Sequence, residues 1–249
     1  MKKIMLAVCA MTMALLMLAG CASSKRSDAQ KDTAPTTQAP TTAATETTVP
    51  TTEAAPTEST AAPKTVSPLP SGIDPAHLDD CTVAVSFDEG DAYVDDTGMM
   101  QLKVKVYAYD IYDTVDISML QVGDQITICR QDVKVTSLER DAYGAVIING
   151  GPENGGYRLI SGNGDESGFF AVEMNDAKLY YELGEATIPV SADEFIFEDS
   201  SNPEKGTCTY YPGDFLVDNG GIEYHFVPNN TTITIQGGYV VNMQRVYIP

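Results

Sequence analysis

Residues 102–109 read Leu-Lys-Val-Lys-Val-Tyr-Ala-Tyr, a strict alternation of small or branched apolar side chains with long polar or aromatic ones. Successive side chains of a β-strand point to opposite faces of its sheet, whereas a helix repeats every 3.6 residues. The period of two therefore predicts a half-buried strand of an antiparallel sheet. Its two faces are expected to carry, in turn, Leu102, Val104, Val106 and Ala108 on the buried side and Lys103, Lys105, Tyr107 and Tyr109 on the other.

A β-hairpin is predicted near the other end of the chain. Thr232–Gln236 alternates in the same way, Gly237-Gly238 interrupts it, and the alternation resumes from Tyr239 to Ile248. Glycine tolerates the positive φ angles that a two-residue hairpin turn requires, so the Gly-Gly pair fits the tip of a hairpin.

Further strands are predicted between these two stretches. Residues 125–129 and 133–138 form one expected pair around a polar turn at 130–132, and residues 168–173 and 178–182 form another around Asn175-Asp176. Val115–Leu120 fits a single helical turn. Together these short elements predict an all-β fold, an antiparallel sandwich or a small barrel. One domain, or two small β units divided near Gly150-Gly151, are both compatible with the pattern.

The charge of the chain excludes one class of partner. It has 15 Lys and Arg against 35 Asp and Glu, a formal net charge of −20, and only two His. Proteins that bind nucleic acid carry a basic footprint for the phosphate backbone, so no nucleic-acid partner is expected. Two histidines are also too few for a His-rich metal centre.

The N-terminal residues have the pattern of an export signal. Lys2 and Lys3 precede an apolar run, Ile4–Leu18, which ends at Leu18-Ala19-Gly20-Cys21. These residues resemble the lipobox of bacterial lipoproteins. The resemblance implies that residues 1–20 are a signal peptide that is removed, and that Cys21 is acylated with fatty acids such as palmitate. It also implies anchoring to the cell membrane on its extracytoplasmic face.

The residues that follow predict a linker. Thirteen Thr lie between Thr33 and Thr65, with Pro spaced among Ala and Glu and no aromatic side chain. Such a composition buries too little apolar surface to offset the entropy of ordering. We therefore expect residues 21–72 to be the lipidated Cys and a disordered Thr/Pro/Ala-rich tether. Residues 73–249 are then an acidic, β-rich extracytoplasmic domain, with 9 basic and 30 acidic residues.

Tyrosine is the residue type most suggestive of a binding surface. The chain has 13 Tyr and no Trp, and Tyr107 and Tyr109 share one face of the strand described above. Tyrosine combines rigid contact area with a polar tip and is common where proteins bind. Tyr107 and Tyr109 are therefore candidate contacts for a cell-surface glycan or protein; the alternative is that they cover a second small core or the exterior of a barrel.

The densest carboxylates predict, at most, a cation site. Asp88, Asp91, Asp95 and Asp96 lie within nine residues, and oxygen ligands of this kind suit Ca²⁺. Their spacing differs from that of an EF-hand loop. The alternative is a solvated acidic turn that leads into the strand at Leu102, and no other cofactor is indicated.

No motif for a hydrolase appears in the sequence, so no catalytic residue is nominated. Three cysteines follow Cys21, namely Cys81, Cys129 and Cys208, so at most one disulfide can form among them. Small buried side chains and a disulfide remain alternatives. The expected function is a non-enzymatic binding or interaction domain on a lipid anchor. The alternatives are an extracytoplasmic hydrolase that uses carboxylates and a structural component of the envelope.

Overall fold

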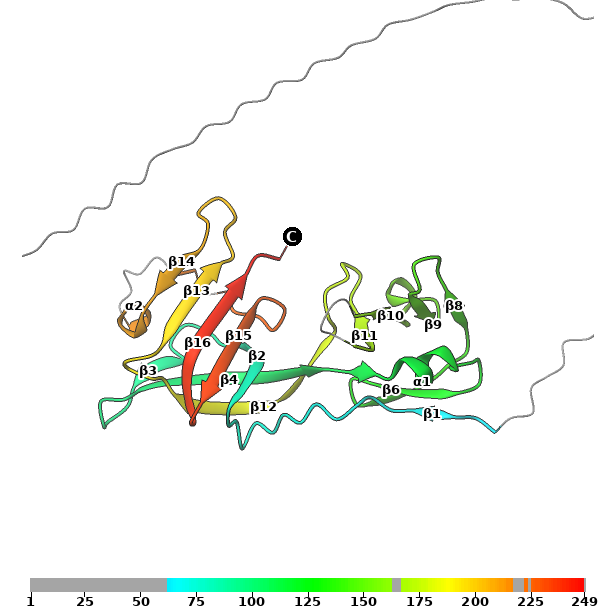
Figure 1. Ribbon diagram of the computed structural model, residues 1–249, viewed down its shortest axis with the longest axis horizontal. Helices are drawn as coiled ribbons and strands as arrows, with labels where there is room; N and C mark the ends of the chain where they lie inside the picture. The colour runs from blue at the N-terminus through cyan, green and yellow to red at the C-terminus, as the bar shows by residue number, and fades with distance from the viewer. Residues whose placement is uncertain (1–61, 163–166, 217–221, 224, 249) are drawn as a thin grey trace, which may run out of the picture. The chain divides into compact units, whose positions relative to one another are not determined.

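The computed structural model describes residues 62–162, 167–216, 222–223 and 225–248 (Figure 1). The expected signal peptide, Cys21 and the tether as far as residue 61 lie outside these described residues. Within the described ranges, no helix has both the length and the apolar character needed to cross a membrane.

One large sheet holds half of the strands. It has eight strands in the order β12-β4-β2-β15-β16-β13-β14, with β3 beside β4. Figure 1 shows that it curls, because β13, β15 and β16 run across the direction of β4 and β12. Its strands are β2 (Cys81–Ser86), β3 (Ala92–Val94), β4 (Met100–Tyr109), β12 (Tyr180–Pro189), β13 (Ile196–Ser200), β14 (Cys208–Tyr210), β15 (Thr231–Gln236) and β16 (Tyr239–Val246).

Two smaller sheets hold the others. A five-stranded sheet has the order β5-β11-β10-β9-β8, and a three-stranded sheet has the order β1-β6-β7. Their strands are β1 (Thr65–Val66), β5 (Ile111–Tyr112), β6 (Gln125–Ile128), β7 (Gln131–Lys134), β8 (Leu138–Arg140), β9 (Val146–Ile148), β10 (Tyr157–Ser161) and β11 (Phe169–Val172). The helical elements are short: α1 (Thr114–Ser118), η1 (Pro152–Asn154) and α2 (Pro212–Leu216).

The all-β prediction is confirmed, and so is the alternation that led to it. Along β4, Leu102, Val104, Val106 and Ala108 are buried, whereas Lys103 and Lys105 are exposed and the two tyrosines are half-buried. Most strand pairs are antiparallel; β1 with β6 and β13 with β16 are parallel. The hairpin at Gly237-Gly238 is also confirmed, with φ angles of 56° and 80° at the two glycines.

The described residues form two hydrophobic cores, and the residues of the second core lie in the chain between two parts of the first. The first lies in the large sheet and includes Val85, Val106 and Ile233. The second lies among the smaller sheets and is built mainly from residues between β4 and β12, such as Ile126 and Leu159. Gly150-Gly151 joins two strands of this second core, because β9 and β10 on either side of it pair with each other. It is therefore a turn within one sheet rather than a boundary.

One expected strand pair is wrong. Residues 168–173 and 178–182 were expected to form a hairpin, but they share only the single bridge between Val172 and Lys178. Strand β11 pairs instead with β10 and β5, and β12 pairs with β4. Each of the two strands thus pairs with other strands than expected, and Lys178 lies where the chain passes from one sheet to the other.

The end of the expected linker also needs correction. Residues 62–72 are ordered, since Thr65 and Val66 form β1 and Val66 is buried in the second core. The Lys64 N–H donates to the buried Asp124 carboxylate at 2.8 Å, and the Gln125 N–H donates to the Lys64 carbonyl. Composition averaged over the linker hides one valine that finds a hydrophobic site, and burying such a side chain contributes about 1.5–3 kcal/mol.

Candidate functional site

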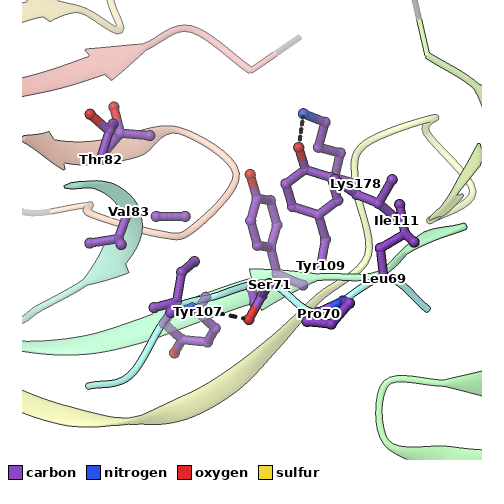
Figure 2. Close-up of a pocket in the computed structure, with 14 residues that line it drawn as sticks. Leu69, Pro70, Ser71, Thr82, Val83, Tyr107, Tyr109, Ile111 and Lys178 are labelled. Atoms are coloured by element: carbon purple, nitrogen blue, oxygen red, sulfur yellow. Dashed lines mark hydrogen bonds between the residues drawn. The ribbon is translucent and has the colours of Figure 1, made fainter. Parts of the chain in front are cut away.

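A partly open pocket of about 440 Å³ lies against the outer face of the large sheet (Figure 2). Its volume falls within the roughly 300–1,000 Å³ of typical small-molecule sites, and its lining is mostly apolar and aromatic. Fourteen residues line it: Leu69, Pro70, Ser71, Ile73, Thr82, Val83, Ala84, Tyr107, Ala108, Tyr109, Ile111, Lys178, Tyr180 and Thr232.

The floor of the pocket is one row of side chains across three strands. Tyr107 on β4 lies opposite Ala84 on β2, and Ala84 lies opposite Thr232 on β15. Ala84 is buried, although it is on the face opposite the first core. Because its methyl group is much shorter than the flanking side chains, the row is lowest at Ala84. The Tyr107 hydroxyl is held by the Ser86 hydroxyl at 3.1 Å.

Aromatic rings and one lysine form a wall. Tyr109 and Tyr180 are cross-strand neighbours whose ring centroids lie 5.4 Å apart in an edge-to-face arrangement. The Lys178 ammonium lies 4.3 Å from the centre of the Tyr109 ring and 3.2 Å from its hydroxyl oxygen, and Figure 2 shows the two groups meeting at one end of the pocket. Phe170 contributes a second ring to Lys178, at 5.3 Å. Cation–π contacts of this kind favour a charged ammonium.

A segment just after β1 forms the rim. The Leu69 N–H donates to the carbonyl of Ile111 at 2.7 Å, and the Ile73 N–H donates to the Ser71 hydroxyl. Ile73 packs against the first core, whereas Val66 is buried in the second. The segment is therefore fixed at both ends, and Leu69, Pro70 and Ser71 are held at the pocket (Figure 2).

A buried carboxylate fixes the backbone between two pocket residues. Asp110 lies between Tyr109 and Ile111, and it accepts hydrogen bonds from the Cys129 N–H at 2.6 Å and from the Tyr112 hydroxyl at 3.3 Å. Tyr181 also hydrogen-bonds to Asp110. Burial, followed by the charge of Asp110, raises the pKa of Tyr181 to about 12 and that of Cys129 to about 11. Both groups stay protonated at neutral pH. The Tyr181 hydroxyl can therefore donate to Asp110, and the Cys129 thiol is not activated as a nucleophile.

The pocket contains the two tyrosines nominated from the sequence. It brings Tyr107 and Tyr109 together with residues that sequence reasoning missed, above all Lys178 and Tyr180. The strand pattern around residues 178–182 was visible, but its pairing with β4 was not. None of the fourteen lining residues is Asp or Glu, so this pocket does not supply the pair of carboxylates that a glycosidase uses.

The four acidic residues proposed for Ca²⁺ form turns instead. Asp91 accepts from the Asp88 N–H, and Asp95 accepts from the N–H groups of Thr97 and Met99 and from the Gln101 amide. Hydrogen bonds from the Thr97 and Gln101 side chains lower the pKa of Asp95 to about 2. Asp88 and Asp96 are exposed. Across the described residues, no group of three His, Cys, Asp or Glu could hold a metal ion, so the geometry gives the calcium hypothesis no support.

The three cysteines of the folded part are free and half-buried. Cys81 and Cys208 lie at the starts of β2 and β14, and Cys129 lies in a turn. This arrangement favours the alternative in which they are small partly buried side chains over the alternative of a disulfide.

Comparison with known proteins adds no assignment. No protein-family model, no curated protein and no solved structure matches this chain. The chemistry of the pocket and the pattern of the N-terminal residues are therefore the basis for the function.

Proposed function

We propose that this protein is a lipid-anchored binding protein of the bacterial cell surface, whose pocket on β2, β4 and β15 binds a glycan. The observation that carries the proposal is the pocket's lining, which combines three tyrosines with the hydroxyl-bearing residues Ser71, Thr82 and Thr232 around the short side chain of Ala84. Sugar rings present both C–H faces, which pack on aromatic rings, and hydroxyls, which need hydrogen-bond partners.

The anchor belongs to the same proposal. The lipobox-like Leu18-Ala19-Gly20-Cys21 would place fatty acids on Cys21, and 40 residues separate this cysteine from the first described residue. Two or three acyl chains hold a protein stably at a bilayer, whereas one is marginal. The binding domain would then face the outside of the cell on a long tether.

The lipid anchor is tested by metabolic labelling with a fatty-acid probe. We expect the native protein to be labelled and found with membranes, and the Cys21→Ser variant to be unlabelled. Cys81→Ser is the matched control, because it removes a thiol of the folded part and should stay labelled. Equal labelling of the native and Cys21→Ser proteins would contradict the anchor.

The pocket is tested by filling it. Ala84→Leu places a larger side chain at the lowest point of the floor, so we expect glycan binding, measured by calorimetry on the detergent-solubilised mature protein, to fall at least tenfold. Thr187→Leu is the matched control, since Thr187 is an exposed residue of β12 that does not line the pocket. If both variants bind as the native protein does, the pocket is not the site. If the native protein binds no glycan, a structural role in the envelope becomes the better explanation.

A further inference from the structure

A second hollow adjoins the pocket and shares one residue with it. It has a volume of about 330 Å³ and is lined by Asp80, Cys81, Thr82, Thr234, Ile235 and Gln236. Thr82 lines both hollows. Figure 2 shows this residue on the far side of the pocket from Lys178. The second hollow therefore continues the pocket beyond Thr82.

The two hollows follow the strand pair β2 and β15. Ala84 lies opposite Thr232 in the pocket, and Thr82 lies opposite Thr234 where the second hollow begins. Alternate residues of a strand point to the same face, so these side chains all belong to the outer face of the sheet. At about 3.4 Å per residue, the stretch from Ala84 to Asp80 covers about 14 Å, which is longer than a single sugar ring.

The second hollow is polar, and its groups keep hydrogen-bonding capacity after their internal bonds are counted. The Thr82 and Thr234 hydroxyls bond to each other at 3.0 Å. Each hydroxyl has one donor and two acceptor positions, so the pair retains one O–H and several lone pairs. The exposed Asp80 carboxylate accepts from the Gly237 N–H at 2.8 Å, which uses one of its roughly four acceptor positions. With the exposed Gln236 amide, these groups suit the hydroxyls of a sugar.

The charge of the protein disfavours an anionic chain. The chain has a net charge of −20, and residues 73–249 contain 30 acidic and 9 basic residues. Asp80 adds a carboxylate to the second hollow itself. An anionic polymer would be repelled along this path, whereas a neutral one would not. A purely apolar ligand would suit the tyrosine rings but would leave the polar groups of the second hollow without partners.

We propose that the ligand is a neutral linear oligosaccharide, which packs one ring in the tyrosine-lined pocket and places the next ring in the second hollow. This inference rests on the proposed function and adds a further binding subsite to it. A monosaccharide reaches only one of the two hollows at a time, so the affinity should increase with the length of the sugar chain.

The test measures affinity against chain length. Glucose, mannose and N-acetylglucosamine are titrated into the full mature protein in detergent, together with the linear dimers and trimers of each, and calorimetry is the readout. For the sugar that binds, we expect the trimer to bind about tenfold more tightly than the monosaccharide, since it adds the hydrogen bonds of the second hollow.

Variants assign this preference to the second hollow. Thr234→Phe fills it, so the preference should fall to about twofold or less, while the monosaccharide affinity stays close to the native value because Thr234 does not line the pocket. Thr209→Phe is the matched control, since Thr209 is an exposed residue of β14 that lines neither hollow. It should leave both affinities unchanged.

A milder variant keeps the test informative if the large side chain disturbs folding. Gln236→Ala removes only an exposed amide from the second hollow and should weaken trimer binding two- to fivefold, with no effect on the monosaccharide. Gln131→Ala, at an exposed position of β7, is its control and should change neither affinity. A thermal melt of each variant establishes that it is folded.

Failure of this inference differs from failure of the proposed function. Equal affinity for monosaccharide and trimer, or a length preference that survives in a folded Thr234→Phe or Gln236→Ala variant, would overturn the second subsite and leave the pocket as a glycan site. Trigalacturonate binding more tightly than every neutral trimer would overturn the neutral ligand. Absence of binding by every sugar at millimolar concentration would overturn the proposed function and this inference with it.

Discussion

Two hairpin turns of this protein both have positive φ angles at their central residues, but one is made of glycines and the other of residues with side chains. Gly237-Gly238 joins β15 to β16, and Cys129-Arg130 joins β6 to β7. All four residues have positive φ angles, of 56° and 80° at the glycines and of 48° and 65° at Cys129 and Arg130. Glycine adopts this conformation freely, whereas it costs other residues about 1–2 kcal/mol each.

Each of the two turns is hydrogen-bonded to a carboxylate, and the two carboxylates differ in their burial. The Gly237 N–H donates to Asp80 at 2.8 Å in an exposed position, and the Cys129 N–H donates to the buried Asp110 at 2.6 Å. Arg130 lies over the ring of Tyr181 at 5.2 Å. The Gly-Gly turn is thus encoded locally, whereas the Cys-Arg turn is held by contacts with Asp110 and with Tyr181 of β12 and would be unfavourable without them.

The largest expected effect comes from removing the buried carboxylate. Asp110→Ala should lower the free energy of unfolding by about 2–4 kcal/mol, because the Cys129 N–H and the Tyr181 hydroxyl lose their acceptor, whereas the Tyr112 hydroxyl keeps the Thr127 carbonyl at 2.9 Å. Chemical denaturation measures this change. Asp80→Asn is the exposed counterpart, and it should change stability by less than about 0.5 kcal/mol, since water reaches the Gly237 N–H. Equal effects would show that burial does not distinguish the two turns.

A smaller effect is expected where glycine is replaced. Gly238→Ala should destabilise the protein by about 1–2 kcal/mol, measured in the same way, because alanine is strained at a φ of 80°. No atom lies within 4 Å of the added methyl group, so the cost is that of the backbone alone. Gly237→Asn is the control, and it should cost less because asparagine tolerates positive φ. A neutral Gly238→Ala would mean that the turn is not locally encoded.

Replacing Arg130 in the other turn by glycine should change stability only slightly, because two opposite effects nearly cancel. Arg130→Gly removes backbone strain of about 1–2 kcal/mol but also the cation–π contact with Tyr181, worth about 0.5–1 kcal/mol. We expect a net stabilisation of about 1 kcal/mol or less by chemical denaturation. A loss of more than 1 kcal/mol would mean that Arg130 contributes more than its contact with the ring.

The smallest effect is seen only in alkali. Burial and the charge of Asp110 raise the pKa of Tyr181 to about 12, while Arg130 acts in the opposite direction. A pKa raised by folding contributes stability that is fully present below the unfolded value of about 10 and is lost as the pH rises through about 12. Ultraviolet titration of tyrosinate should therefore show a late step that Tyr181→Phe removes. In Arg130→Gly that step should move to higher pH, and a shift to lower pH would contradict the arrangement.

The same contrast explains which parts of the site could be predicted. Tyr107 and Tyr109 could be placed on one face from the alternation of residues 102–109 alone. Lys178 and Tyr180 could not be assigned to that face, since the nearest strand, β11, was the natural partner for β12. The rim at Leu69–Ser71 was hidden in a Pro-rich stretch whose average composition predicts a linker.

The sequence by itself determined the all-β class, the faces of β4, the Gly-Gly turn and the acidic charge, because each depends on side chains within a few residues of one another. The tertiary structure alone decided the strand pairs, the place of β1, the Cys129-Arg130 turn and the pocket. These depend on contacts between distant residues, such as the hydrogen bond between Thr82 and Thr234, 152 positions apart. A local pattern tells which side of a strand is buried, but packing free energy summed over the whole chain selects the strand that covers it.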